Sequence, residues 1–478
     1  MSGDERFDRE LRSALRGLAA DPAPERLVQR VASIPGRSPL PAPRRSFARL
    51  VTALAAAAVL VLAGGLVIAT RPGGPVPVGG NRPAGAATAS PAPASQPAVA
   101  ASTPAASAPT SAPLGPTGGP VPAGFQVVSA TFVSPDLGWV LGTSVCSTPP
   151  CTAILRTADG GRTWTRIPAP ATPVSPGPVQ PGTTPGVTGL RFADPLDGWA
   201  FGPDLWVTHN GGATWARVTI PGVSSGAVVE ALETSAGTVH AVLYDVGAAG
   251  SWVRLASGPV GSNGWTLSPT QVQIGAGPVP QAQLLLSGSA GWMVEVDRTV
   301  VGGARLVNGN WAAWTPPCST VMGPAVLAAS GPTEVVAACD GGIWGPAPTA
   351  AEEGQRLYAS HNGGTTFAEI GATVPLTGVN AVASPAAGAV LAAGSTSAAS
   401  ALVGSFDGGR TWHTLLRVSQ TGGQAATFTY LGFTTPTQGM AITQSGNVSG
   451  SAAPLGTGTL YLTRDGGRTW SPVAFSGQ

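Results

Sequence analysis

One six-residue string, DGGRTW, occurs three times in this chain, at residues 159–164, 407–412 and 465–470. Each copy follows a short apolar run that ends in Ser or Thr, as in ILRTADGGRTW, LVGSFDGGRTW and LYLTRDGGRTW. Two looser copies are THNGGATW at 208–215 and SHNGGTTF at 360–367. The shared pattern is Ser/Thr-x-Asp/Asn-Gly-Gly-x-Thr-Trp/Phe. It is either a loop that performs chemistry or a turn that the fold needs repeatedly.

The spacing of the copies predicts the number of structural units. They begin at residues 157, 208, 360, 405 and 463, so the gaps are 51, 152, 45 and 58. Because 152 is about three times 51, two eroded copies are expected between the second and third. SGPVGSNGWTL (257–267) and LVNGNWAAW (306–314) retain parts of the pattern there. Seven units with a period near 50 residues indicate a solenoid or a propeller.

A second repeated feature gives the same number of units. Upstream of the loops, an aromatic or aliphatic residue precedes a Gly-x pair. The strong examples are Phe132 with Gly138-Trp139, Phe192 with Gly198-Trp199, Leu285 with Gly291-Trp292, and Phe433 with Gly439-Met440. Weaker equivalents are GTVHAVLYD (237–245), PTEVVAACD (332–340) and GAVLAAG (388–394). Each unit therefore predicts four strands, A to D, and the fold class is all-β: a seven-bladed β-propeller of four-stranded antiparallel blades.

The chemistry of the string fits a hairpin turn between strands C and D. Two glycines permit positive φ, and an Asp or Asn side chain accepts hydrogen bonds from the backbone of its own turn. The Trp or Phe supplies a large apolar contact. Two copies carry Asn, an exchange that a general acid or nucleophile does not tolerate. We therefore assign a structural role to Asp159, Asn210, Asn362, Asp407, Asp465, Trp164, Trp215, Phe367, Trp412 and Trp470.

On these residues the chain resembles the Asp-box, or bacterial neuraminidase, repeat superfamily. The pattern of Phe132 and Gly138-Trp139 followed by T-x-DGG-x-TW is most similar to the photosystem II stability/assembly factor family, and more distantly similar to sortilin-type and sialidase-like propellers. The resemblance covers about residues 125–475. It implies blades whose loops lie on the outer rim, away from a central ligand site. It implies no single function, because the repeat occurs in hydrolases, receptors and assembly factors.

The region before the repeats predicts a membrane anchor. Between Arg49 and Arg71 lie 21 uncharged residues, LVTALAAAAVLVLAGGLVIAT, which span roughly 30 Å as a helix. Most nearby Arg residues precede this segment, so the positive-inside bias predicts a single-pass protein with a cytoplasmic N-terminus and an extracytoplasmic propeller. The alternative is export by a twin-arginine signal, from RRSF at 44–47, followed by cleavage.

The chain is therefore predicted to contain four segments of different character. Residues 1–48 form a cytoplasmic amphipathic helical segment, 49–70 a transmembrane helix, 71–122 a Pro/Ala/Ser-rich disordered linker and 123–478 the propeller. Residues 1–35 weakly resemble the cytoplasmic ends of anti-sigma factors, which implies a sigma-factor-like partner. The His and Cys of the zinc motif that many of these proteins carry are missing before Cys146. A solvated or membrane-lying tail is the other interpretation.

Charge and cysteine content narrow the function further. Residues 123–478 carry 13 Arg against 17 acidic residues, a balance that excludes a nucleic-acid-binding surface of clustered positive charge. The four cysteines fall into two local pairs, which we predict as disulfides of an oxidising compartment. Their spacing matches no compact zinc pattern, so we predict no metal site and no cofactor. The pairs are Cys146 with Cys151 and Cys318 with Cys339.

A cell-surface glycoside hydrolase, sialidase-like or glucanase-like, is the enzymatic alternative. A sialidase needs an Arg triad, a Tyr nucleophile and a partnering Glu. Tyr244 is the best-placed tyrosine by sequence, with Glu230, Glu233 and Asp245 nearby.

A glucanase needs paired carboxylates instead. Glu295 and Asp297 would lie on one side of a strand, whereas Asp194 and Asp197 lie in an A–B turn, where acids commonly serve turn chemistry. The weak catalytic candidates are therefore Tyr244, Glu295 and Asp297.

The function that the sequence favours is non-catalytic. We expect a binding or scaffold module for a protein, peptide or envelope glycan, in envelope sensing or assembly. The long segments 168–187, 343–355 and 444–458 all fall in B–C or D–A connections, which share one face of a propeller. Long loops on a rigid scaffold commonly bind ligands, so we expect the ligand on that face.

Overall fold

The computed structural model describes residues 118–175, 185–247, 250–274, 281–297, 299–318, 325–339, 355–396, 399–418, 426–445 and 456–475. The predicted cytoplasmic segment, the predicted transmembrane helix and nearly all of the linker lie outside these residues. Among the residues that are described, no helix has the length and apolar character needed to cross a bilayer.

The described residues form seven four-stranded antiparallel sheets, each built from four consecutive strands. Blade 1 contains β1 (Gln126–Phe132), β2 (Gly138–Thr143), β3 (Thr152–Thr157) and β4 (Thr165–Ile167). Blade 2 contains β5 (Gly189–Phe192), β6 (Gly198–Phe201), β7 (Trp206–Thr208) and β8 (Ala216–Arg217). Blade 3 contains β9 (Val228–Ser235), β10 (Thr238–Gly247), β11 (Gly250–Pro259) and β12 (Thr266–Ile274).

The remaining four blades repeat this order. Blade 4 contains β13 (Gln281–Ser287), β14 (Ala290–Asp297), β15 (Thr299–Val307) and β16 (Asn310–Trp314). Blade 5 contains β17 (Ala325–Ala329), β18 (Val335–Cys339), β19 (Gln355–Ser360) and β20 (Ala368–Val374). Blade 6 contains β21 (Gly378–Ala383), β22 (Val390–Ser395), β23 (Ser400–Ser405) and β24 (His413–Val418). Blade 7 contains β25 (Ala426–Phe433), β26 (Gly439–Ser445), β27 (Thr457–Thr463) and β28 (Ser471–Pro472).

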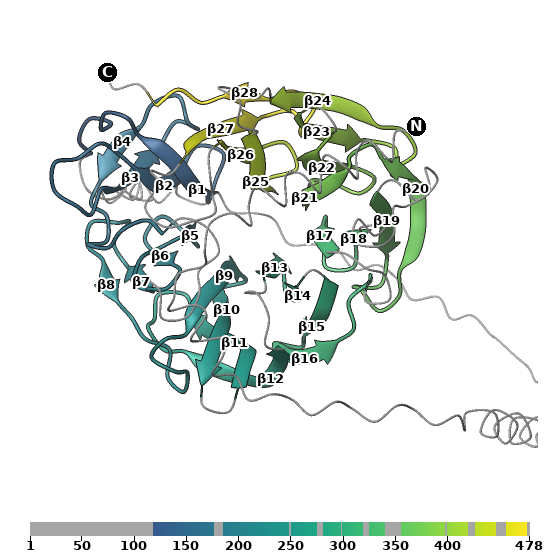
Figure 1. Ribbon diagram of the computed structural model, residues 1–478, viewed down its shortest axis with the longest axis horizontal. Coiled ribbons are helices and arrows are strands. Elements are labelled where there is room, and N and C mark those ends of the chain that lie inside the picture. Colours follow the sequence, from purple (N-terminus) through teal and green to yellow (C-terminus); the bar gives the residue numbers. More distant parts are fainter. Residues whose placement is uncertain are drawn as a thin grey trace, which may run out of the picture. The chain divides into compact units, whose positions relative to one another are not determined.

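The first strands of the blades surround a common axis (Figure 1). β1, β5, β9, β13, β17, β21 and β25 contact one another in that order, and β1 also contacts β26 and β27 of the last blade. The fold is therefore a closed seven-bladed propeller, as the repeat spacing predicts. The eroded copies at 257–267 and 306–314 span the β11–β12 and β15–β16 hairpins, where the count of seven needs them.

Side chains, rather than an exchanged strand, join the last blade to the first in the described residues. Gln438 Nε2 donates to the carbonyl oxygen of Pro135 at 2.9 Å, and Gly458 N–H donates to Gln126 Oε1 at 3.0 Å. Near the C-terminus, the ring of Phe475 packs edge-on against Phe125, with 5.0 Å between centroids. The N–H and C=O of Gly119 pair with Arg166 of β4, so residues 118–122 lie on blade 1 although the sequence places them in the linker.

The five repeat loops, defined as residues 157–164, 208–215, 360–367, 405–412 and 463–470, connect the third and fourth strands of their blades. In the first loop, Gly160 and Gly161 have φ of 73° and 89°, a region open to glycine because it lacks Cβ. Gly160 N–H donates to Asp136 O in the first turn of the same blade at 2.8 Å. The other loops repeat this bond, in the pairs Gly211–Leu196, Gly363–Thr333, Gly408–Gly388 and Gly466–Thr437.

The Asp or Asn side chain of the loop forms hydrogen bonds with backbone and Thr groups of the same loop. Asp159 Oδ1 accepts hydrogen bonds from the N–H groups of Arg162 and Thr163 at 3.0 and 2.9 Å, and Oδ2 accepts from Thr163 Oγ1 at 2.6 Å. In the second loop, Asn210 Oδ1 accepts from Thr214 N–H at 2.9 Å, and Asn210 Nδ2 donates to Thr214 Oγ1 at 2.8 Å. The amide thus reproduces the carboxylate's contacts without its charge, which is what a turn residue requires.

The second glycine of each loop faces the preceding blade. A Cβ on Gly161 would lie 2.8 Å from Leu462 Cδ1 of blade 7, and a Cβ on Gly212 would lie 2.6 Å from Ile167 Cδ1 of blade 1. A side chain at this position would therefore displace the apolar side chain of the preceding blade, in addition to straining the positive φ.

The loop aromatics pack on the aromatic residue that ends the inner strand. Trp164 stands edge-on to Phe132, with centroids 6.3 Å apart and planes at 85°. The same arrangement recurs in two other blades, in the pairs Phe192–Trp215 and Phe433–Trp470. Between blades, Trp139 stacks on Phe192 at 3.8 Å. The two sequence features that define the repeat therefore contact each other in space.

A histidine lies buried at the contact between blades 3 and 4. His240 on β10 is 5% exposed. Its Nδ1 accepts a hydrogen bond from Trp311 Nε1 at 3.2 Å and lies 2.7 Å from Ser257 Oγ. Burial lowers the pKa of His240 to about 4, so the ring is neutral in the folded protein at neutral pH.

We expect Asp159→Asn to leave the free energy of unfolding nearly unchanged, and Asp159→Ala to lower it by about 1 kcal/mol, because only Asn keeps the hydrogen bonds. Burial acts to raise the pKa of Asp159, but hydrogen bonds from Thr163 and Thr157 outweigh it and lower the pKa to about 2. The carboxylate's contribution is therefore present above pH 4 and lost as the pH falls toward 2. Urea unfolding of both variants tests this; equal losses would contradict the turn role.

We expect His240 to make the propeller less stable in mild acid. Its pKa is lower when folded than when unfolded, so its contribution is complete above about pH 6.5 and is lost on acidification toward pH 4. His240→Gln should flatten the fall in the free energy of unfolding between pH 7 and pH 5 by at most about 2 kcal/mol. His413→Gln, at an exposed position on β24, is the control. Identical slopes for wild type and His240→Gln would refute this.

Candidate functional site

A cavity of about 1040 Å³ lies along the propeller axis. Its walls come from the inner strands β5, β9, β13, β17, β21 and β25, and from the turns that follow them, including Pro385 and Pro436. The cavity thus extends along most of the length of β9, β13, β17, β21 and β25, whereas β5 contributes Arg191 alone. β1, which the structure describes in full, contributes no lining residue.

Side chains from three blades meet in front of β1; we call Tyr430, Arg191 and Glu233 the Arg191 arc. Arg191 on β5 forms an ion pair with Glu233 on β9, with 2.8 Å between Nε and Oε1. Its guanidinium carbon lies 5.0 Å from the centroid of the Tyr430 ring on β25. Its Nη1 also donates to Ala130 O of β1 at 3.3 Å and to Leu190 O at 3.0 Å.

The side chains of the arc are held together by charge in a region that is largely shielded from solvent. Arg191 is 13% exposed and Glu233 is 30% exposed. Burial alone would lower the pKa of Arg191, but the charge of Glu233 outweighs it and raises the pKa. Burial raises the pKa of the Tyr430 hydroxyl, which the charge of Arg191 only partly opposes. Arg191 is therefore charged at neutral pH, and Tyr430 is a neutral phenol.

Polar side chains of the cavity wall mostly tie one blade to the next. An inner strand has a free edge whose N–H and C=O groups need partners. Gln283 on β13 supplies both to Leu327 on β17: its Nε2 donates at 2.9 Å and its Oε1 accepts at 2.7 Å. Outside the cavity lining, Ser129 Oγ on β1 forms the same kind of bond by accepting from Leu190 N–H at 3.1 Å. Much of the polarity of the wall is therefore structural.

Three of the cavity's polar residues occupy β-bulges at equivalent places. Ala231 and Val229 pair with consecutive residues of β10, which leaves Glu230 as the extra residue between them. Asn380 on β21 and Thr429 on β25 are extra residues in the same way. A bulge re-aims a side chain and is common near functional sites. All three residues line the cavity, and Asn380 and Thr429 are exposed in it.

Glu230 differs from the other acids of the cavity. It accepts a hydrogen bond from the backbone N–H of Ala282 on β13, and burial raises its pKa to about 8 against the effect of that bond. Its Oε2 is buried and has no hydrogen-bond partner within the described part of the chain. The carboxyl group is thus protonated at neutral pH, while Glu233 on the same strand pairs with Arg191.

The structure does not assemble the predicted Tyr244 cluster. Tyr244 on β10 is 7% exposed and packs in an apolar cluster with Leu284 between blades 3 and 4. Asp245 pairs with Arg254 at 3.1 Å. Burial acts to raise the pKa of Asp245, but hydrogen bonds from Ser224 and from Arg254 lower it overall. Only Glu230 and Glu233 of this group reach the cavity, because they lie on the inner strand.

The paired carboxylates are not presented to a ligand in the expected way. Glu295 on β14 is completely buried, and its role as a catalytic candidate stays a prediction. Asp297 ends β14, where its backbone pairs with Thr299; its side chain lies outside the described atoms. Asp194 Oδ1 accepts the N–H of Asp197 at 2.9 Å, which is turn chemistry.

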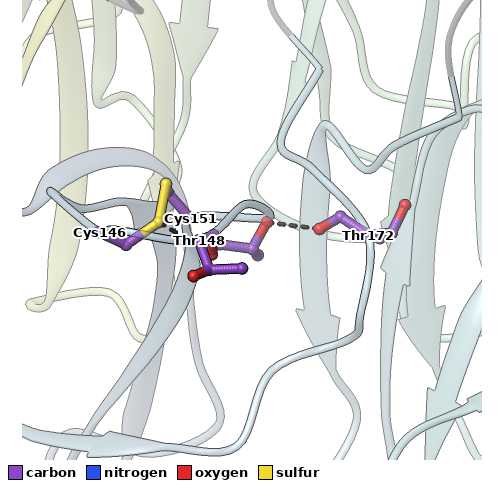
Figure 2. The surroundings of a disulfide bond; sticks show 5 residues. Cys146, Thr148, Cys151 and Thr172 are labelled. Atoms are coloured by element: carbon purple, nitrogen blue, oxygen red, sulfur yellow. Dashed lines mark hydrogen bonds between the residues drawn. A yellow bond between two sulfur atoms is a disulfide. The ribbon is translucent and has the colours of Figure 1, made fainter.

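Both predicted disulfides form. Cys146 and Cys151 close the loop between β2 and β3, with Cα atoms 5.5 Å apart. The Cys146 sulfur lies 3.3 Å from Thr148 O (Figure 2). Cys318, after β16, is joined to Cys339 at the end of β18. Two disulfides in a chain of this size indicate an extracytoplasmic propeller. The described residues hold no group of three His, Cys, Asp or Glu side chains arranged to bind a metal.

Sequence reasoning missed the Arg191 arc. Arg191 and Tyr430 both lie on predicted A strands, a position that places a side chain near the axis. The signal was therefore in the strand assignment, but alternation alone does not show which strand face looks into the cavity. The expected ligand face rests on the segments 168–187, 343–355 and 444–458, and the greater part of these lies outside the described residues.

No protein-family model and no curated protein matches the sequence. Solved propellers are similar in fold. YCF48 bound to D1 peptide is 19% identical over 68% of this chain and 93% of its own, with a TM-score of 0.45. The GH74 enzyme of Niastella koreensis is 15% identical over 74% of this chain and 60% of its own, with a TM-score of 0.40. The Aleuria aurantia lectin with Fucalpha1-6GlcNAc is 12% identical over 73% of this chain and 94% of its own, with a TM-score of 0.40. Similarity at this level assigns no function.

We expect Arg191→Leu to lower the free energy of unfolding by about 3 kcal/mol, because it leaves Glu233 as an uncompensated charge. Adding Glu233→Gln should recover part of that loss, giving a favourable interaction term in a double-mutant cycle by urea unfolding. Arg356→Leu is the control, since Arg356 pairs with Glu369 in an exposed position and should matter little. Additive losses at Arg191 and Glu233 would show that the two side chains do not interact.

Proposed function

We propose that this chain is a membrane-anchored extracytoplasmic propeller that binds a protein, a peptide or an envelope glycan without chemical conversion. The observation that carries the proposal is the axial cavity, into which exposed side chains are re-aimed by bulges. Cavities of this size on rigid scaffolds are the usual place for ligands. The resemblance of the chain to Asp-box proteins supports a propeller scaffold and does not identify the ligand.

The chemistry of the cavity supports binding over catalysis. A tyrosine nucleophile needs activation by a base or by a lowered pKa, whereas burial raises the pKa of Tyr430. Arg191 uses its donors on Glu233 and on two backbone carbonyls. The group that a sialidase-like reaction needs most is thus engaged in holding blades together.

A glycoside hydrolase is the second candidate, and one observation favours it. Glu230, whose pKa burial raises to about 8, and Glu233, which is paired with Arg191, lie on one strand of one cavity. A carboxyl group with a raised pKa beside a second carboxyl group is the equipment of acid-assisted glycoside hydrolysis. Under this alternative, purified chain releases reducing sugar from envelope glycans, and both Glu230→Gln and Glu233→Gln abolish the release. Under the binding proposal no sugar is released.

We expect Thr429→Trp to abolish capture of the ligand, because the indole would occupy the axial cavity. The full chain, purified in a mild detergent, is immobilised and exposed to an envelope fraction, and the retained material is quantified by mass spectrometry. Thr414→Trp, at an exposed position on the outermost strand β24, should retain what wild type retains. Equal retention by all three proteins would place binding elsewhere, and no specific retention by wild type would reject the proposal.

An N-terminal segment that contacts a sigma-factor-like protein would make the propeller a sensor. Co-purification of such a partner with residues 1–35 of the full chain would support this role over pure scaffolding.

A further inference from the structure

The charged groups of the cavity wall leave unequal capacity for a ligand. Arg191, the cationic side chain among the described lining residues, is engaged with Glu233 and with two backbone carbonyls. Glu233 engages Arg191 through Oε1 while its side chain is 30% exposed, and Glu230 Oε2, although buried, has no partner among the described residues.

The apolar part of the wall suits a long aliphatic stem. Leu285, Leu286, Val326 and Ala381 line the cavity between its polar groups. A lysine or arginine side chain buries such a stem along apolar surface while its charged head seeks a polar partner. Because the cavity extends along most of the length of five inner strands, it accepts an extended segment rather than a compact molecule.

We propose that the cavity binds a polypeptide through a lysine or arginine side chain, whose cationic head pairs with Glu233 beside Glu230. This inference rests on the proposed binding function and names its ligand class. Glu233 is the exposed acceptor. Glu230 lies three residues before it on β9 and supplies a second carboxylate once it loses its proton.

The protonation of Glu230 depends on the charged and titratable groups that surround it. The charged and titratable groups in the cavity wall are Glu233 on the same strand, Arg191 on β5 and Tyr430 on β25. β13, on the other side, contributes Gln281, Ala282 and Gln283, which are neutral. Behind these, Glu295 on β14 is in register with Ala282.

On its other side, β9 pairs with β10. There His240 is in register with Glu233, and because burial lowers its pKa to about 4 the ring is neutral at neutral pH. Tyr244 is buried among apolar side chains and Asp245 is paired with Arg254. The cation of a bound ligand is therefore the new charge that Glu230 meets on binding.

Binding is consequently linked to proton release. Below pH 8 the free protein holds a proton on Glu230, and a cation beside the carboxyl group favours its loss. Affinity for the cationic peptide should rise by up to about tenfold per pH unit between pH 6 and pH 7.5. The sign follows because the complex binds fewer protons than the free protein.

The test uses the full chain in mild detergent and three labelled twelve-residue peptides of Gly, Ser and Ala that carry Lys, Gln or Glu at the same two positions. Fluorescence anisotropy should give at least about tenfold tighter binding for the Lys peptide. Glu230→Gln, which is isosteric with the protonated carboxyl group, should remove the pH dependence. Glu233→Gln should weaken binding at least about tenfold. Glu369→Gln, on the outer strand β20, should change neither.

Each contrary result overturns a defined part of the account. Equal binding of the Lys and Gln peptides, or no binding of any peptide, rejects the cationic ligand. A pH slope that persists in Glu230→Gln rejects the role of Glu230. Displacement of the Lys peptide by an equal concentration of 1,5-diaminopentane identifies a free amine rather than a polypeptide. If Thr429→Trp still abolishes capture from envelope fractions, these failures leave the binding function standing and remove only its ligand class.

Discussion

In five of the seven blades, a hydrogen bond from the first glycine of the repeat loop to the first turn of the same blade holds the outer hairpin against the inner one. In blade 1 it joins Gly160 to Asp136. It fixes the outer hairpin against the inner one, and the second glycine then sets the distance to the preceding blade. Both glycines have positive φ, and in four of the five loops a Cβ on the second would press against the preceding blade. Five repetitions of one local geometry thereby set the blade spacing around the ring.

A ring built in this way leaves backbone groups unpaired at the edges of its inner strands, and polar side chains on these strands supply the missing hydrogen-bond partners. Gln283, Ser129 and Arg191 each place a polar group on the backbone of a neighbouring inner strand. The Arg191 arc does this across blades 7, 1, 2 and 3, which include the seam between the last blade and the first. The carboxyl groups of Glu230 and Glu233 can still accept further hydrogen bonds, and the proposed ligand chemistry follows from these acceptors.

The sequence alone predicts the propeller because its repeat is local. Loop residues such as Asp159 contact residues within a few positions, so their spacing counts blades directly. The residues of the axial cavity could not be predicted in the same way. Tyr244 and Glu295 lie on second strands, which pack between blades, whereas Tyr430 and Glu233 lie on first strands. Within a first strand, a bulge at Glu230 shifts the alternation by one residue, so period-two patterning no longer tells which side chains reach the axis.

The central claim is that the repeat loops build the scaffold and the axial cavity carries the function. The most direct test replaces all three loop aspartates at once, as Asp159→Asn, Asp407→Asn and Asp465→Asn, and measures capture of envelope material alongside thermal unfolding. The account predicts wild-type capture, because Asn keeps the turn contacts and nothing in the cavity changes. Loss of capture with an unchanged melting temperature would contradict it, since the loops themselves would then hold the ligand.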